Sequence, residues 1–187
     1  MEHAACEGRF LLDLWQVLLE EVELPELLRR AAHYLERELC PCQPVALFIA
    51  EGERLEMAAW KNLGEREIEV AFRSLTHPDD PNARFLFSHQ EAVYLNARAT
   101  AFPIMIDWGT QDKRLVIGAL ALPARSEDRK LIDEICFALG IGISRATAFM
   151  LVRDQRDAEQ ARAEAVLAEL RGRRPGPGRR GQPHRRH

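Results

Sequence analysis

The chain has 187 residues, 47% hydrophobic and 29% charged, which suits one soluble globular domain with its own core. The net charge is −3, but residues 171–187 contain seven arginines and no acidic residue, so the rest of the chain is strongly acidic. An acidic folded part repels phosphate groups and is not expected to bind nucleic acid. No signal peptide opens the chain and no apolar run reaches the roughly 18 residues of a membrane span, which predicts a cytoplasmic protein without membrane contact.

The N-terminal part of the chain predicts two helices. Apolar residues recur at helical spacing over residues 11–19. Pro25 is suited to the first turn of a second helix, whose inner face would run over residues 27–39. Pro41 and Pro44 would end this helix, because proline lacks the N–H that a helix interior needs.

The motif Cys-Pro-Cys lies where the second helix is expected to end. A structural zinc site usually takes its cysteines in two pairs, each with a spacer of two to four residues. Here one residue separates Cys40 from Cys42 and no second pair exists. We therefore interpret both as small apolar residues at a helix–strand joint, with a redox role for exposed thiolates as the alternative.

No metal site is predicted elsewhere in the sequence either. The best ligating chemistry belongs to His77, Asp79, Asp80 and His89, since imidazole and carboxylate bind metal ions. No pair among them has the i, i+4 spacing of a helical metal motif, and neighbouring prolines favour a solvated turn.

The remainder of the chain predicts alternating strands and helices, followed by a polar tail. We expect a hairpin from strands over 45–49 and 55–60, a helix over 65–75, a loop over 76–90, strands over 92–96, 101–108 and 115–123, and a helix from an N-cap at Ser126 to Leu170. This order predicts an α+β fold in which helices cover one face of an antiparallel sheet. Two glycines in GIGIS (residues 140–144) indicate close packing of the final helix against a neighbour.

The segment PIMIDWGTQDKRLVIGALALPARSEDRKLIDEICFALGIGISRATAFMLVRD resembles the C-terminal half of a GAF domain. Gly118 and Leu120 match the family's strand pattern, and Asp128 and Ile135 match its acidic-capped helix. The resemblance covers roughly residues 20–155. It implies a GAF-like antiparallel sheet of about five to six strands covered by helices, with a long C-terminal linker helix. The domains would be an N-terminal helix (1–20), a GAF-like domain (21–150), a linker or signalling helix (151–171) and a disordered basic tail (172–187).

The resemblance implies a sensory domain that binds a small molecule and signals through its terminal helices. Such domains precede effectors in bacterial transcriptional activators and two-component sensor kinases; the ligand and any cofactor stay unknown. One branch of the family reduces free methionine sulfoxide with cysteines in its pocket loops, but no cysteine lies between Cys42 and Cys136, so no enzyme is expected. The alternatives are a ligand-free dimerisation or scaffold module, whose pocket its own side chains would fill, and a free-standing reductase.

In this family the region corresponding to residues 62–100 usually shapes the ligand pocket. Aromatic residues surround it and polar side chains lie among them, a composition typical of small-molecule pockets. Arg84 would pair with an anionic group of the ligand. The candidate pocket residues are Trp60, Phe72, His77, Arg84, Phe85, His89, Phe102 and Trp108.

The terminal helices predict a homodimer. The first helix has more apolar residues than one small sheet can cover, and Leu151, Ala158 and Ala165 follow a heptad spacing. A solvated single helix is the alternative for this linker. The candidate interface residues are Phe10, Leu14, Trp15, Leu18, Leu131, Ile135 and Leu151.

Overall fold

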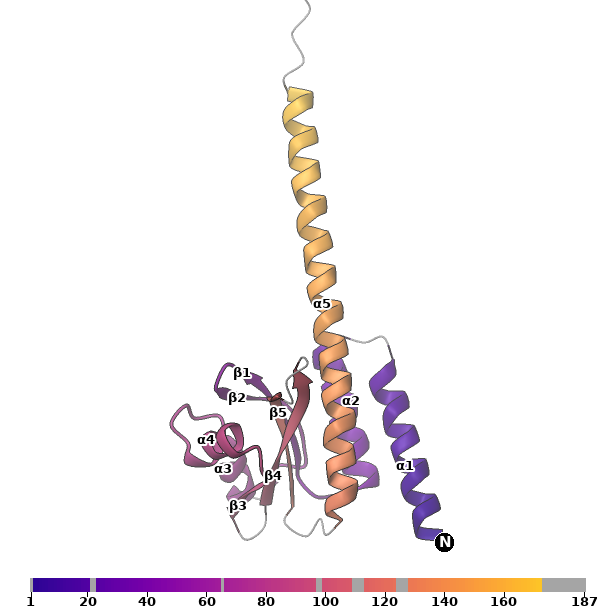
Figure 1. Cartoon of the computed structure of the whole chain (residues 1–187), viewed down its shortest axis with the longest axis vertical. Coiled ribbons are helices and arrows are strands. Elements are labelled where there is room, and N and C mark those ends of the chain that lie inside the picture. Colours follow the sequence, from indigo (N-terminus) through magenta and orange to yellow (C-terminus); the bar gives the residue numbers. More distant parts are fainter. Residues whose placement is uncertain are drawn as a thin grey trace, which may run out of the picture. The chain divides into compact units, whose positions relative to one another are not determined.

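The computed structural model describes residues 2–20, 23–64, 66–96, 99–108, 113–123 and 128–172. Their elements, in chain order, are α1 (Glu2–Leu19), α2 (Leu24–Glu38), β1 (Val45–Glu51), β2 (Arg54–Lys61), α3 (Arg66–Ser74), α4 (Pro81–His89), β3 (Val93–Asn96), β4 (Ala99–Trp108), β5 (Lys113–Pro123) and α5 (Arg129–Gly172) (Figure 1). The chain divides into two compact units, Met1–Ala148, here called the domain unit, and Phe149–His187, the linker unit.

The sheet of the domain unit is antiparallel throughout, with the strand order β2-β1-β5-β4-β3. Strand β5 pairs with β4 along its whole length, from Ala99↔Pro123 to Trp108↔Lys113. Strand β3 is short and pairs only with residues 99–101 of β4. Within the described residues, β4 beyond Ala101 therefore pairs on one side only, with β5, and residues 102–108 are called the half-paired stretch. Pro103 lies in this stretch, where the absence of a backbone N–H is tolerated.

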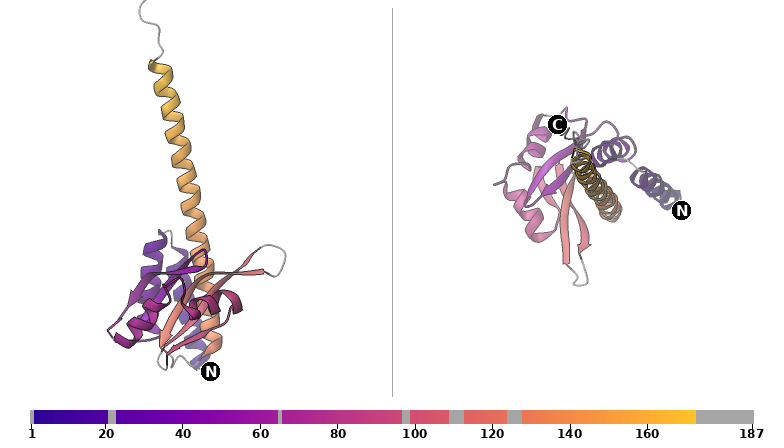
Figure 2. Two further views of the ribbon diagram at one scale, coloured as in Figure 1. Left: turned by 90° about the vertical axis from the view of Figure 1, so that its left-hand side faces the viewer. Right: turned by 90° about the horizontal axis from the view of Figure 1, so that it is seen from above.

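Helices cover both faces of this sheet, so the predicted cover of one face is wrong. On one face, α2 and α5 pack on β-strand residues such as Leu47, Ile104 and Leu120, and α1 packs outside them against α2 and α5. On the other, α3 and α4 pack on a surface that includes Ala101 and Ala119. Figure 2 shows the sheet between these two helical layers. Burial from both sides explains why β1 and β5 have nearly continuous apolar runs instead of alternating ones.

A short helix, α4, replaces part of the loop predicted over residues 76–90. Asp80 is its N-cap, and the carboxylate accepts hydrogen bonds from the backbone N–H groups of Asn82 and Ala83 at 2.9 and 3.0 Å. Pro81 follows in the first turn, where its fixed φ suits a helix. The Asp-Pro pair that favoured a turn is thus a helix start.

Helix α5 begins after Asp128, whose carboxylate accepts a hydrogen bond from the N–H of Leu131 at 3.0 Å. The predicted cap, Ser126, lies outside the described residues. Gly140 and Gly142 confirm the close-packing interpretation, because a Cβ atom would lie 2.7 Å from the Met105 carbonyl oxygen at the first and 3.0 Å from Leu18 at the second.

The Cys-Pro-Cys motif forms the predicted joint between α2 and β1. Cys40 is buried in the core, whereas Cys42 is exposed and has a positive φ of 59°. The carboxylate of Glu36 accepts hydrogen bonds from the Cys42 N–H and from the Asn62 side chain, at 3.1 and 2.7 Å. These contacts hold the joint in place, and both cysteines are part of it.

By length and composition alone, α5 is long and apolar enough to cross a membrane, and the absence of membrane contact stays a prediction. Its most apolar window has a mean hydropathy of 1.9, and 44% of that window is buried inside the fold. A core helix of a globular domain has the same composition. The packing of Ile135 and Leu139, both fully buried, accounts for part of this apolar content.

Candidate ligand groove between strand β4 and helix α5

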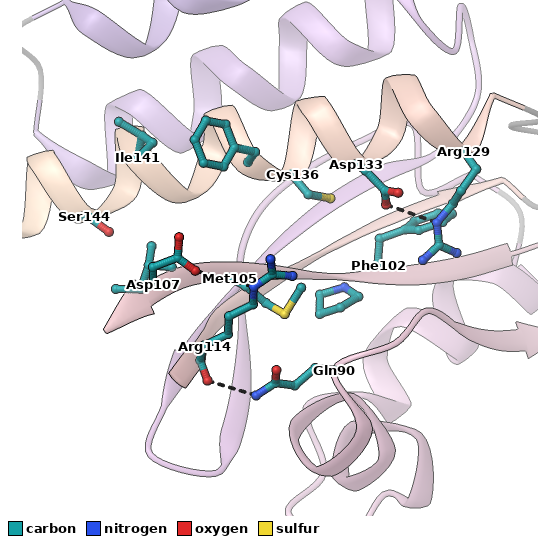
Figure 3. A pocket seen from close by; sticks show the side chains of 13 residues that line it. Gln90, Phe102, Met105, Asp107, Arg114, Arg129, Asp133, Cys136, Ile141 and Ser144 are labelled. Atoms are coloured by element: carbon teal, nitrogen blue, oxygen red, sulfur yellow. Dashed lines mark hydrogen bonds and ion pairs between the residues drawn. The ribbon is translucent and has the colours of Figure 1, made fainter. Parts of the chain in front are cut away.

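A groove of about 710 Å³ opens between the half-paired stretch of β4 and the N-terminal part of α5 (Figure 3). All of it lies within the domain unit. The residues that line it are Gln90, Phe102, Pro103, Met105, Ile106, Asp107, Arg114, Arg129, Asp133, Cys136, Phe137, Ile141 and Ser144.

The geometry of the groove follows from helical spacing and from the end of β3. Arg129, Asp133, Phe137 and Ile141 succeed one another at i, i+4 spacing, so they form one row along α5. Phe137 and Ile141 remain 59% and 41% exposed. The β4 side is accessible because β3 stops pairing at Ala101.

Two arginine–aspartate pairs border the groove. Arg129 donates from Nε to Oδ1 of Asp133 at 3.1 Å, and Nε of Arg114 lies 3.4 Å from Oδ1 of Asp107. Both pairs are well exposed, so each contributes little to stability. The Arg129 guanidinium also lies 5.5 Å from the centroid of the Phe102 ring, a cation–π contact that orients it.

Two further polar groups of the groove lie on α5. Burial, with a smaller effect of the Asp133 charge, raises the pKa of Cys136 from 9.0 to about 12. Cys136 is therefore a neutral thiol at physiological pH and a poor nucleophile. The Ser144 Oγ atom is buried and has no hydrogen-bond partner among the described residues, which leaves its donor and acceptor capacity for another molecule.

Of the predicted pocket residues, Phe102 lines this groove. Trp60 is 53% exposed on β2, at the edge of the sheet, and Phe72 is fully buried with its ring 6.4 Å from that of Phe48. The side chain of Trp108 lies outside the described part of the structure. The structure thus does not bring Trp60, Phe72 and Phe102 together around one cavity.

The predicted polar pocket residues gather around α4, on the surface. Arg84 is exposed and donates to Asp79 at 2.5 Å, while the His89 ring stacks on Phe85 at 4.2 Å. His77 is exposed, and its Nδ1 accepts a weak hydrogen bond from the Asp79 N–H at 3.3 Å. A ligand role for these residues stays a prediction. Within the described residues, no group of three His, Cys, Asp or Glu side chains could hold a metal ion.

The face beneath α3 and α4 is closely packed. The sheet presents mainly alanines there, together with Phe48 of β1, and Phe72, Leu75 and Leu86 pack on them with no exposed surface. Small residues on the sheet let the two helices approach it closely. The region expected to shape a pocket therefore contributes a second hydrophobic core.

Three predicted interface residues lie in the core of the domain unit. Leu14, Leu18 and Ile135 are fully buried in the core, so they are not part of its free surface. Of the others, Phe10, Trp15 and Leu131 are partly buried against this core, and Leu151 is 59% exposed. Leu12 and Leu19, which are 66% and 52% exposed on α1, were not among the predicted interface residues. Their spacing of seven residues, which places both on one side of the helix, was the signal available in the sequence.

No protein-family model and no curated protein matches the sequence. Solved structures do match. The GAF domain of a phosphoenolpyruvate-protein phosphotransferase from Coxiella burnetii is 16% identical with a TM-score of 0.56, over 79% of this chain and 98% of that one. The A. aeolicus nlh2 GAF domain in an inactive state is 13% identical with a TM-score of 0.53, over 75% and 97%. The reductase fRMsr of Staphylococcus aureus, solved in complex with its substrate, is 12% identical with a TM-score of 0.53, over 73% and 95%. This chain therefore has the fold of a GAF domain.

Proposed function

We propose that this chain is a GAF-type sensory domain, which binds a small ligand in the β4–α5 groove and signals through α5. The observation that carries the proposal is that one wall of the groove belongs to α5, the same helix that continues to Gly172. A ligand that contacts this wall would change the position or order of the helix. By analogy with other GAF domains, the effector would be a cytoplasmic transcriptional or two-component partner.

The groove is a better ligand site than the face beneath α3 and α4. Phe72 and Leu86 have no exposed surface beneath α3 and α4, and a ligand would have to displace them. The groove already has a volume within the range of about 300–1,000 Å³ that is usual for small-molecule sites. It also combines exposed apolar side chains with a few polar groups.

We propose no catalytic activity. The cysteine that lines the groove, Cys136, has a pKa of about 12 because it is buried, so little thiolate forms at neutral pH. Cys42 is exposed, but it lies on the joint between α2 and β1 and does not line the groove. These positions argue against the reductase alternative.

The second candidate function is a ligand-free dimerisation or scaffold module. It is favoured by the closely packed face beneath α3 and α4, and by the exposed Leu12 and Leu19 on α1. Under this alternative the groove would bind no small molecule, and the apolar residues of α1 would pack against a second copy.

A thermal-shift screen of a metabolite library tests the proposal. Ile141→Trp should fill the groove, because Ile141 lines it and is 41% exposed; Val152→Trp places the same ring on a 64% exposed position of α5 outside it. We expect compounds that stabilise the wild type and Val152→Trp but not Ile141→Trp. These compounds should also change amide hydrogen exchange over residues 149–172. Equal stabilisation of Ile141→Trp would reject the groove, and a screen without hits would favour the scaffold alternative.

A further inference from the structure

We infer that the groove binds an amphipathic small anion, a molecule with an apolar body and one carboxylate or similar group. This inference rests on the proposed function, since it names the class of ligand for the same site. It follows from three features of the groove: its apolar wall, the way its arginines are paired, and a buried hydroxyl group without a partner.

The apolar body is indicated by the wall of the groove. Phe137 and Ile141 stay largely exposed although they are large and apolar, and Met105 lies opposite them on β4. Covering such side chains removes apolar surface from water at about 25 cal/mol per Å². A wholly polar ligand would leave this surface without a partner.

The anionic group is indicated by the arginines. Both Arg114 and Arg129 face their aspartates through Nε. No hydrogen bond between the described residues engages their terminal Nη groups, the pair of donors that binds a carboxylate side-on. Arg129 is already oriented over the Phe102 ring, so a ligand need not order it.

A cation fits this groove less well than an anion. Each aspartate of the groove, Asp107 and Asp133, already has an arginine beside it, so an incoming cation would meet like charge within a few ångströms. An anion can instead accept hydrogen bonds from the Nη groups of Arg114 and Arg129, because the aspartates contact these arginines through Nε. Cys136 adds no negative charge, because it is a neutral thiol at neutral pH.

Ser144 supplies the third feature. Its Oγ is buried in the wall and lacks a partner among the described residues, whereas buried hydroxyl groups are normally hydrogen-bonded. Figure 3 shows Ser144 and Arg129 toward opposite ends of the α5 wall. The anionic group is therefore expected near Arg129, and Ser144 offers a separate polar contact at the other end of the groove.

Two fluorescent probes of matched shape test this inference: 8-anilinonaphthalene-1-sulfonate, which is anionic, and N-phenyl-1-naphthylamine, which lacks the sulfonate. Affinities are measured by titration for the wild type, Arg129→Gln, Arg114→Gln and Ile141→Trp. Arg84→Gln is the control, because Arg84 is an exposed arginine paired with Asp79 outside the groove. Thermal melts confirm that each variant is folded.

We expect Ile141→Trp to abolish binding of both probes at the groove. Arg129→Gln should weaken the anionic probe about tenfold, the lower end for a hydrogen bond to a charged group, and leave the neutral probe unchanged. Arg114→Gln should act in the same direction, and Arg84→Gln should change neither affinity. Ile141→Trp could block both probes while Arg129→Gln and Arg114→Gln change the two affinities equally. In that case the groove is a ligand site, but the anionic ligand class is wrong. If Ile141→Trp blocks neither probe, or no probe binds the wild type, both the inference and the groove fail.

Discussion

Replacing Gly140 with alanine tests how closely α5 approaches the sheet. The added Cβ would lie 2.7 Å from the carbonyl oxygen of Met105, and 3.5 and 3.6 Å from methyl groups of Ile106 and Ile104. The oxygen belongs to the backbone of β4, which is held by its pairing with β5, and cannot rotate away. The helix must therefore move from the strand by ~0.5 Å, a gap that costs a quarter or more of the dispersion energy at each contact it opens.

The magnitude follows from two opposing effects. Alanine is more favourable than glycine inside a helix by about 1 kcal/mol. Overpacking of a core site costs about 1–3 kcal/mol, and the backbone contact places Gly140 toward the upper end. We expect Gly140→Ala to lower the free energy of unfolding by ~1–2 kcal/mol.

Gly142 provides a matched control on the same helix. It gains the same helix propensity on replacement, but its contacts are side-chain atoms of Leu18, Cδ2 at 3.0 Å and Cβ at 3.2 Å, which lie farther away than the backbone oxygen that Gly140 meets at 2.7 Å. Gly142→Ala should therefore be less destabilising than Gly140→Ala. Urea unfolding followed by far-UV circular dichroism measures both variants. If Gly140→Ala is as stable as Gly142→Ala, the close approach of α5 to β4 is wrong.

Four further predictions concern stability and assembly. The free energy of unfolding should fall as pH rises from 9 toward 12, because the folded state disfavours the Cys136 thiolate, and Cys136→Ala should flatten this slope in urea titrations. Leu12→Glu should weaken a dimer at least ~tenfold in sedimentation equilibrium, since Leu12 is 66% exposed on an apolar face. Arg84→Ala should change the free energy of unfolding by less than ~0.5 kcal/mol, because its pair with Asp79 is exposed. Deleting residues 173–187, which have no apolar side chain to bury, should leave the melting temperature unchanged.

Each of these predictions has an outcome that contradicts it. A pH slope identical in Cys136→Ala would show that other groups cause the alkaline loss of stability. A wild type that sediments as a monomer, or a Leu12→Glu variant that dimerises normally, would remove α1 from the interface. Clear destabilisation by Arg84→Ala would show that its ion pair with Asp79 stabilises the fold, and a lower melting temperature after the tail deletion would show that the tail does.

Local sequence patterns predicted most of the elements. The period of apolar residues located β1, β2, α3 and the three last strands, and Pro25 marked the start of α2. The start of α4 was missed because Asp80 and Pro81 suit both a turn and a helix N-terminus, and only the hydrogen bonds of Asp80 distinguish them. The continuous apolar run of β5 already indicated burial on both faces, which the expected one-sided cover ignored.

The site was harder to predict, because it depends on tertiary geometry. The groove is accessible where β3 stops pairing with β4 at Ala101, a length that local propensity does not determine. Arg129 and Ile141 become its wall through the orientation of α5, which Gly140 permits by its close contact with Met105. The spacing of Arg129, Asp133, Phe137 and Ile141 could have identified one face of the helix, though not what lies opposite it.

The linker unit gives an argument for a partner that holds for both candidate functions. Every described side chain of residues 151–169 is exposed, including Leu151 and Val152, so this part of α5 gains no stability from burial within the single chain. Internal contacts such as the hydrogen bond from Gln160 to Glu164, at 3.0 Å, contribute only about 0.2–0.5 kcal/mol each. Because most helical stability in proteins comes from packing of an apolar face, we propose that a second helix packs against this part of α5. A sensor would use that contact to transmit its signal and a scaffold would use it to assemble, so dimerisation alone does not separate them, whereas ligand binding in the groove does.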